Sequence, residues 1–226
     1  PVAVYEYLQY SGDKTILEET FNAMETVIDT FINKIDKDTN LIAEFPYPYW
    51  NFYEWSEGSS NEDQISRTKD AYYPKKYSLI LNAEFLYIIE YYKKLCKAYG
   101  KSFEFDDSAM RKAIVDTFFV PEKGLFKATD IGEPYYTTLG NSYAILAGLA
   151  GAELADKLIE GKDLIPITLS MCIYLYDALL KVDKKYKDFI IADIDNKYKR
   201  MLDMGATTFW ETEKGWEDQG QAGSMC

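Results

Sequence analysis

The chain has 226 residues, 47% of them hydrophobic, and its 37 acidic and 25 basic residues give a formal net charge of −12. This length supports one sizeable core and a single domain, and an acidic chain without a basic stripe is a poor partner for nucleic acid or anionic membranes. Histidine is absent, which excludes Ser-His-Asp and Cys-His triads and histidine-ligated zinc.

Helical periodicity dominates the first half of the chain. Residues 2–11 predict the end of a buried helix, and residues 17–35 predict an amphipathic helix with Asp13 as its N-cap. Residues 77–99 are apolar almost all round in their first half and predict a helix that is buried on most sides. Residues 107–118 predict a second amphipathic helix.

The same alternation continues through the second half of the chain. Residues 142–150 are small and apolar, which suits close helix packing, and a short helix is expected at 152–160. Residues 166–180 are nearly all apolar. Residues 184–204 predict a final amphipathic helix that is stopped by Gly205 at its C′ position.

Buried and amphipathic helices therefore alternate as about four pairs, with long connections at 37–74, 120–140 and 205 onward. Because antiparallel helices alternate in direction, these connections must emerge at one end. They hold a large share of the aromatic residues, namely Trp50, Trp55, Trp210, Trp216, Tyr47, Tyr49, Tyr53, Tyr135 and Tyr136. The sequence predicts an all-α (α/α) toroid with about four of six hairpins and an aromatic rim. A helix-pair solenoid is the alternative, although no fixed sequence period supports it.

The cysteines and the apolar segments bear on the compartment. Cys96, Cys172 and Cys226 are widely spaced and odd in number, which indicates neither a disulfide framework nor a zinc knuckle. The longest apolar stretch, residues 164–176, is too short for a bilayer, which needs roughly 20 apolar residues. We expect a cytoplasmic protein with no membrane partner.

The segment after the last helix suggests sugar chemistry. Gly205-Ala206-Thr207-Thr208-Phe209-Trp210-Glu211 places a carboxylate beside a tryptophan, and a second tryptophan follows on a glycine-rich loop. Tryptophan faces stack on the apolar faces of sugars, and carboxylates transfer the protons of glycoside hydrolysis. Glu211 is the first candidate, ahead of Glu213, Glu217 and Asp218. The alternative is that Glu211 is an ordinary exposed loop carboxylate.

Residues 205–211 resemble the GATTxWE loop of the six-hairpin α-L-rhamnosidases, an inverting glycoside hydrolase family. The resemblance implies that Glu211 is the general base and that no metal or organic cofactor takes part. In that family a Cys-His-Gly-Trp motif follows shortly after, and this sequence ends on Ser224-Met225-Cys226, where the motif would begin. We therefore expect residues 1–226 to form part of a toroid glycosidase catalytic domain.

The family's general acid lies in an Asp-Glu-Arg…Gly-Trp…Gly-Asp segment, and nothing in this sequence matches it. We therefore expect the chain alone to be inactive, with the remainder of its own domain as its partner and a carbohydrate as its substrate.

The loop 45–58 is the second aromatic constellation. In the rhamnosidase-like family the corresponding loop often ends in Asp-Trp, and here Glu54-Trp55 stands in that place. The resemblance implies that Trp55 packs on the bound sugar, with Trp50 and Glu54 as weaker candidates. The alternative is that these rings merely cover the core.

Residues 135–142 also resemble the family, in which a Thr-x-Gly-Asn stretch leads into an inner helix. Asn141 is a candidate to bond a sugar hydroxyl, but helix capping is the favoured interpretation. Tyr136 is a candidate rim contact. Glu84 and Glu90 lie in an otherwise apolar helix, where we expect them to be paired or to face outward, because burying a lone carboxylate is costly.

The sequence thus predicts a glycoside hydrolase fragment that acts on terminal α-L-rhamnosides or similar glycosides. A toroid glycosidase for another sugar is the alternative among enzymes. Outside enzymes, the alternatives are a non-catalytic carbohydrate-binding or structural module and a helical scaffold for protein interactions. The scaffold predicts an exposed hydrophobic groove and no convergence of Trp55 with Glu211.

Uncovered flanks of the terminal helix pairs predict self-association. A partial toroid leaves apolar helix faces without neighbours, and burial of those faces favours a homo-oligomer. Light scattering on the purified chain is expected to give the mass of a dimer or a larger species. A clean monomer at high concentration would contradict this prediction.

Overall fold

A computed structural model describes residues 1–46, 48–57, 59 and 75–210. Its helices alternate between an inner and an outer layer. The inner helices are α1 (Val2–Ser11), α4 (Leu79–Tyr99), α6 (Thr138–Leu146) and α8 (Cys172–Val182). The outer helices are α2 (Thr15–Ile32), α5 (Ser108–Phe118), α7 (Ala152–Glu160) and α9 (Lys187–Asp203). The smaller elements are two 3-10 helices, Leu169–Met171 and Lys184–Tyr186, and a hairpin of β1 (Phe119–Val120) and β2 (Leu125–Phe126).

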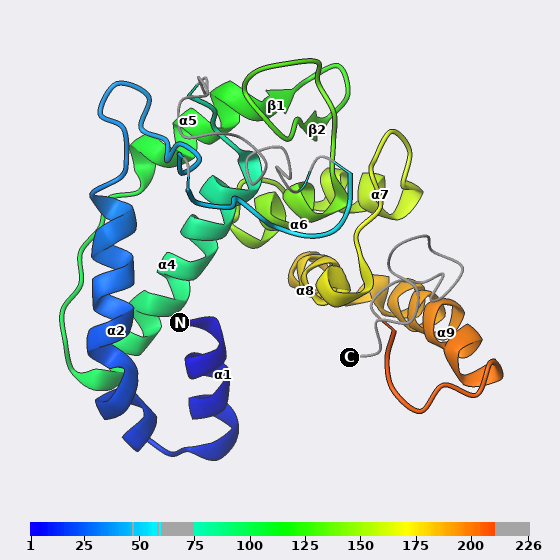
Figure 1. Cartoon of the computed structure of the whole chain (residues 1–226), viewed down its shortest axis with the longest axis horizontal. Helices are drawn as coiled ribbons and strands as arrows, with labels where there is room; N and C mark the ends of the chain where they lie inside the picture. The colour runs from blue at the N-terminus through cyan, green and yellow to red at the C-terminus, as the bar shows by residue number, and fades with distance from the viewer. Residues whose placement is uncertain (47, 58, 60–74, 211–226) are drawn as a thin grey trace.

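The inner helices contact one another in the order α1, α4, α6, α8, and α2, α5 and α7 each contact the inner helix that precedes them. The α8–α9 pair is joined by a hydrogen bond of 2.7 Å from the Tyr176 hydroxyl to Asp193 Oδ2. The hairpins follow one another around an open arc, with α1 and α2 at one end and α8 and α9 at the other (Figure 1). This arrangement confirms the predicted all-α toroid of helical hairpins.

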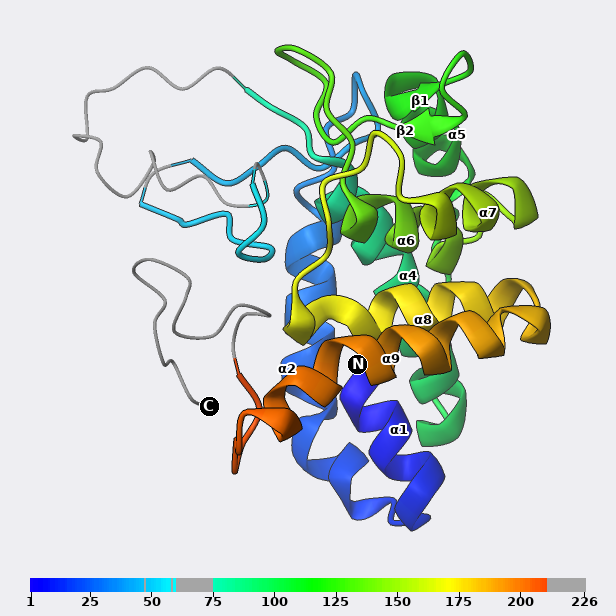
Figure 2. The same cartoon turned by 90° about the vertical axis from the view of Figure 1, so that its right-hand side faces the viewer.

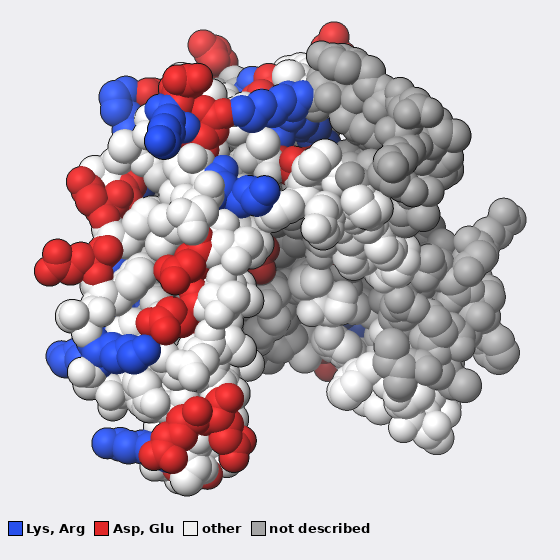
Figure 3. Space-filling model, turned by 60° about the vertical axis from the view of Figure 1, so that its left-hand side comes forward, with Lys and Arg blue, Asp and Glu red and all other residues white. Residues whose placement is uncertain are grey.

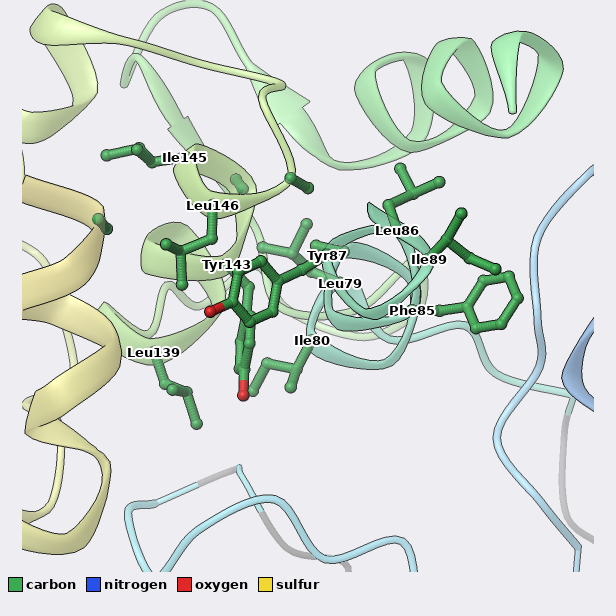
Figure 4. Close-up of a cluster of buried hydrophobic side chains, with 14 of the residues drawn as sticks. Leu79, Ile80, Phe85, Leu86, Tyr87, Ile89, Leu139, Tyr143, Ile145 and Leu146 are labelled. Carbon is green, nitrogen blue, oxygen red and sulfur yellow. The ribbon is translucent and has the colours of Figure 1, made fainter. Parts of the chain in front are cut away.

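The core lies where α4 and α6 pack together. All nine residues of α6 are buried, and α4 buries Leu79, Leu86 and Ile89 completely, as the alternation of helix types predicts. Figure 4 shows Tyr143 and Leu146 of α6 on the side that faces α4, with Tyr87 beside them, whereas Phe85 and Ile89 project from the opposite side of α4. By contrast, α9 buries only Ile190 and Met201, so its outer face meets solvent.

Glycines end the inner helices that lead into short connections. Gly12 follows α1 with a φ of 68°, and Gly100 follows α4 with a φ of 80°. These left-handed conformations are strained for residues with a Cβ atom, so glycine lets the chain reverse at once into the outer helix.

The described parts of the long connections gather on one side of the helices, as predicted (Figure 2). A short β-bridge between Ala43 and Tyr77 closes the connection before α4 on itself. Two more bridges join neighbouring connections, because Ser78 pairs with Thr129 and Thr137 pairs with Ile165. Residues far apart in sequence are thereby fastened into a single rim above the inner helices.

Two buried asparagines anchor this rim to the inner helices. Asn82 of α4 accepts a hydrogen bond from Ile42 N at 2.7 Å and donates to Ile42 O at 3.0 Å and Ser78 O at 2.8 Å. Asn141 of α6 repeats this pattern, accepting from Phe126 N at 2.9 Å and donating to Phe126 O and Thr137 O at 3.0 Å each. Each amide therefore satisfies both backbone groups of one loop residue.

The anchored residues belong to a motif that recurs after three outer helices. In each copy a residue with positive φ is followed by leucine and then by a bulky apolar residue. The copies are Asn40-Leu41-Ile42, Gly124-Leu125-Phe126 and Asp163-Leu164-Ile165, with φ values of 57°, 63° and 62° at their first residues. The structure thus contains a repeat that is too short and too variable to be recognised in the sequence beforehand.

Two expectations about helix ends are wrong. The cap of α6 is Thr137, whose hydroxyl accepts from Gly140 N at 3.1 Å, while Asn141 lies inside the helix and binds the rim. The helix predicted at 17–35 ends at Ile32, because Ile35 is already paired with Ile42 in the following turn. The helical spacing of apolar residues continues past the end of the helix.

The distribution of surface charge and the state of the cysteines can be compared with the expectations from composition. Acidic and basic side chains are interspersed on the face shown in Figure 3, with no continuous basic stripe across it. Within the described ranges, no helix has the length and apolar character needed to cross a membrane. Cys96 and Cys172 are buried and free, and Cys226 lies outside the described residues.

Replacing Asn141 with alanine is expected to lower the free energy of unfolding by about 2–5 kcal/mol, because Phe126 N and O both lose their buried partner. Urea unfolding followed by circular dichroism measures this change. Asn22→Ala is the matched control, since Asn22 is exposed on α2 and should change stability by about 0.5 kcal/mol or less. Equal losses in the two variants would contradict the anchoring role.

Candidate functional site

The aromatic loop, residues 45–59, is held in shape by its own polar groups. Asn51 accepts from Phe45 N and donates to Phe45 O, both at 2.8 Å, and Tyr53 N donates to Ser59 O at 2.9 Å. The same bidentate amide pairing that anchors the rim therefore also closes this loop. Its rings are presented from a fixed backbone.

Trp50, Phe52 and Trp55 form a cluster on this loop. Ring centroids lie 4.7 Å apart for Trp50–Phe52 and for Phe52–Trp55, and 6.1 Å apart for Trp50–Trp55. The two tryptophans remain 43% and 42% exposed. Rings that merely covered the core would lose most of their exposed surface, so these indoles are open to a ligand.

Glu54, which precedes Trp55, is buried, with only 1% of its surface exposed. Its Oε2 atom accepts from Thr168 N at 2.8 Å and from Thr168 Oγ1 at 2.9 Å. In the described part of the chain its Oε1 atom is buried and has no hydrogen-bond partner. Glu54 thus fastens the aromatic loop to the segment that leads into α8, and it fixes the backbone that carries Trp55.

Two further candidates lie below the rim surface. Tyr136 is 8% exposed, and its carbonyl accepts from Ile165 N at 2.8 Å. Asn141 is fully buried, and its amide binds backbone as described above. Both residues support the rim from beneath.

The segment after α9 lies on the same side of the helices as the aromatic loop (Figure 2). Gly205 follows the helix with a φ of 74°, as predicted for its C′ position. Tyr198 and Phe209 pack edge to face at 5.7 Å beside a cavity of about 230 Å³. Trp210 is half-buried and makes no ring contact with Trp50 or Trp55 among the described residues. Glu211, the candidate base, lies outside the described residues.

Glu84 was not among the predicted site residues, and it differs from Glu90. Glu90 keeps 44% of its side chain exposed and lies 3.5 Å from Lys93 Nζ and 3.8 Å from Arg111 Nη2. Glu84 is half-buried, and its Oε1 atom accepts from the Tyr143 hydroxyl at 3.2 Å. Burial raises the pKa of the Glu84 carboxyl above its ordinary value. The expectation that these two glutamates are paired holds for both, with a tyrosine hydroxyl as the partner of Glu84 and cations as the partners of Glu90.

Glu84 was detectable in principle from its place in the helix. It lies two residues after Asn82, just as Tyr143 lies two residues after Asn141. This correspondence between Glu84 and Tyr143 can be recognised only once Asn82 and Asn141 are known to occupy equivalent positions in α4 and α6. No group of three or more potential metal ligands occurs within residues that the structure describes.

Comparison with known proteins identifies the fold. A sequence profile described as the bacterial α-L-rhamnosidase six-hairpin glycosidase domain matches residues 1–226. Among solved structures, the chain is similar to the glycoside hydrolase family 78 rhamnosidase of Bacillus sp. GL1. The TM-score is 0.76 at 19% identity, over 99% of this chain and 23% of that one. No curated protein matches the chain.

A second similar structure is a rhamnosidase from Klebsiella oxytoca with rhamnose bound, at a TM-score of 0.67 and 16% identity. The match covers 92% of this chain and 38% of that one. The chain therefore spans well under half the length of either solved relative. At these identities the two structures show a shared fold.

Glu54→Ala is expected to lower the free energy of unfolding by about 2–4 kcal/mol, because Thr168 loses two hydrogen bonds to a buried carboxylate. It should also alter the near-ultraviolet circular dichroism of the tryptophans, since their loop is released from α8. Glu57→Ala, on the exposed part of the same loop, is the control. An unchanged spectrum in Glu54→Ala would show that Trp55 is oriented by other contacts.

Proposed function

Because the chain belongs to the bacterial α-L-rhamnosidase six-hairpin glycosidase domain family, we propose that it supplies the sugar-stacking and water-activating part of an inverting glycosidase site. The substrate class is terminal α-L-rhamnosides or similar glycosides. One observation carries the proposal: two half-exposed tryptophans stand on a loop that a buried glutamate fixes to the inner helices.

The tryptophan cluster suits a sugar for a physical reason. A pyranose ring has one face of C–H groups, which packs on an indole, and a rim of hydroxyls that require hydrogen bonds. Trp50 and Trp55 offer aromatic surface, and the buried Glu54 is the residue before Trp55. The bound rhamnose in the Klebsiella oxytoca relative supports this assignment of ligand class. Tyr136 and Asn141 then act by holding the rim.

Glu211 takes the role of general base in this proposal. In an inverting reaction one carboxylate removes a proton from water while a carboxylic acid protonates the leaving oxygen, the two lying roughly 6.5–9.5 Å apart. The sequence match at 205–211 carries this assignment, and the position of the segment after α9 on the side of the aromatic loop is consistent with it (Figure 2). The reaction requires neither metal nor organic cofactor.

The general acid is assigned to residues outside these 226, because this sequence contains no match to the family's acid segment. That same observation favours the second candidate function, a non-catalytic sugar-binding or structural module. A toroid glycosidase of different sugar specificity remains the alternative within enzymes, since one fold serves many substrates.

Hydrolysis of p-nitrophenyl α-L-rhamnoside by the protein encoded in the complete reading frame tests the proposal. Glu211→Gln is expected to lower kcat by about 1,000-fold, because amide cannot accept the proton of water and general base catalysis contributes about 10²–10⁴-fold. Trp55→Ala is expected to raise KM by about tenfold through loss of stacking area.

The matched control is Glu57→Gln, an exposed glutamate on the aromatic loop that should leave both constants unchanged. The 226-residue chain assayed alone is expected to be inactive. If the complete protein hydrolyses no glycoside in a broad panel yet still binds sugars, the binding-module alternative replaces the catalytic proposal.

A further inference from the structure

Three inner helices place a polar side chain at the same level. In each helix one residue near the start donates a hydrogen bond to the carbonyl four residues earlier: Asn82 to Ser78, Asn141 to Thr137, and Cys172 to Thr168. The residues two positions further along are therefore equivalent. They are Glu84 of α4, Tyr143 of α6 and Tyr174 of α8.

These three side chains contact one another across the inner layer. The Tyr143 hydroxyl donates to Glu84 Oε1 at 3.2 Å, and the rings of Tyr143 and Tyr174 lie 4.9 Å apart. Figure 4 shows Tyr143 between α4 and α6. Glu84 and Tyr174 each remain partly exposed, so the row is accessible at both of its ends.

The described residues place no cation beside the Glu84 carboxyl group. No lysine or arginine Nζ or Nη atom of the described residues lies within 4.0 Å of it, although Glu90 on the same helix has two cationic neighbours. Its sequence neighbours Ala83 and Phe85 are buried, and desolvating a carboxylate among such residues costs stability. At the two equivalent positions a tyrosine fills the space, so packing alone does not explain why α4 has a glutamate at this position.

Tyr53 connects the aromatic loop to the start of the same connection. Tyr53, one residue before Glu54, directs its hydroxyl to Glu44 Oε1 at 3.4 Å. Burial, and then the charges of Glu44 and Glu84, raise the pKa of Tyr53 above its usual value.

We propose that Glu84, with the hydroxyls of Tyr143 and Tyr174, forms a subsite on the inner helices that binds hydroxyl groups of a neutral pyranoside. One Glu84 oxygen accepts from Tyr143, and the other accepts from a hydroxyl of the sugar. This inference rests on the proposed function and assigns the inner wall of the same site.

The test measures dissociation constants for methyl α-L-rhamnopyranoside and for its 2-deoxy and 3-deoxy analogues by calorimetry, in the protein from the complete reading frame. Glu84→Gln keeps the shape of the side chain and removes the charge. It is expected to weaken binding of the parent sugar about tenfold, as for a lost hydrogen bond to a charged group. Glu90→Gln, six residues further along the same helix, should bind as the wild type does.

The deoxy analogues separate contact from a merely structural role. If Glu84 accepts one of these hydroxyls, the wild-type protein discriminates against the matching deoxy sugar, and Glu84→Gln loses that discrimination at an unchanged melting temperature. Glu84→Tyr, which restores the side chain of the equivalent positions, should also fold and bind weakly.

Unchanged binding in both Glu84 variants, with binding lost in Trp55→Ala, overturns this inference and leaves the proposed function standing. Absence of sugar binding and of hydrolysis in the wild-type protein overturns the proposed function, and the subsite falls with it. Discrimination retained in Glu84→Gln would also count against the contact.

Discussion

Pairing of a buried asparagine amide with both backbone groups of a single loop residue is the constraint on which the rim depends. A loop that lies on the core must satisfy its N–H and C=O groups without water, and an amide offers one acceptor and two donors for this purpose. Asn82 and Asn141 each do so, and their remaining N–H closes the first turn of the helix. The long connections are thereby anchored to α4 and α6, the most buried helices.

The candidate site is assembled on that anchored rim. Glu54 and Thr168 are 114 residues apart, yet their contact joins the aromatic loop to α8. The neighbouring connections are bridged to one another at Ser78 and Thr129 and again at Thr137 and Ile165. The exposed indoles are therefore carried by an irregular loop that has the rigidity of the helices beneath it, which stacking against a sugar ring requires.

The sequence predicted the layers of this fold because helical periodicity and loop length are local properties. It identified the inner and outer helices, and the shared rim followed from their alternating directions. It failed where an assignment depends on contacts between distant segments. In sequence Asn141 resembles a helix cap, but in the structure its side-chain amide is hydrogen-bonded to the backbone of Phe126. Glu84 cannot be distinguished from Glu90 by sequence, because the difference is the contact of Glu84 with Tyr143 of α6. For the site, aromatic composition predicted the loop, while the contact between Glu54 and Thr168 had no local signal.

The distribution of charge separates stability from function in this chain. Cations are placed where they compensate carboxylates at or near the surface, as Lys101 does for Glu25 and Arg111 does for Asp107. Glu54 and Glu84 receive hydroxyl and backbone donors instead, Glu54 on the aromatic loop and Glu84 on α4. A nearby cation would stabilise each carboxylate but would also occupy the oxygen that a ligand hydroxyl needs. The cost of desolvating both groups is thus concentrated where the rim meets the inner helices, which is where a sugar held by the tryptophans would meet them.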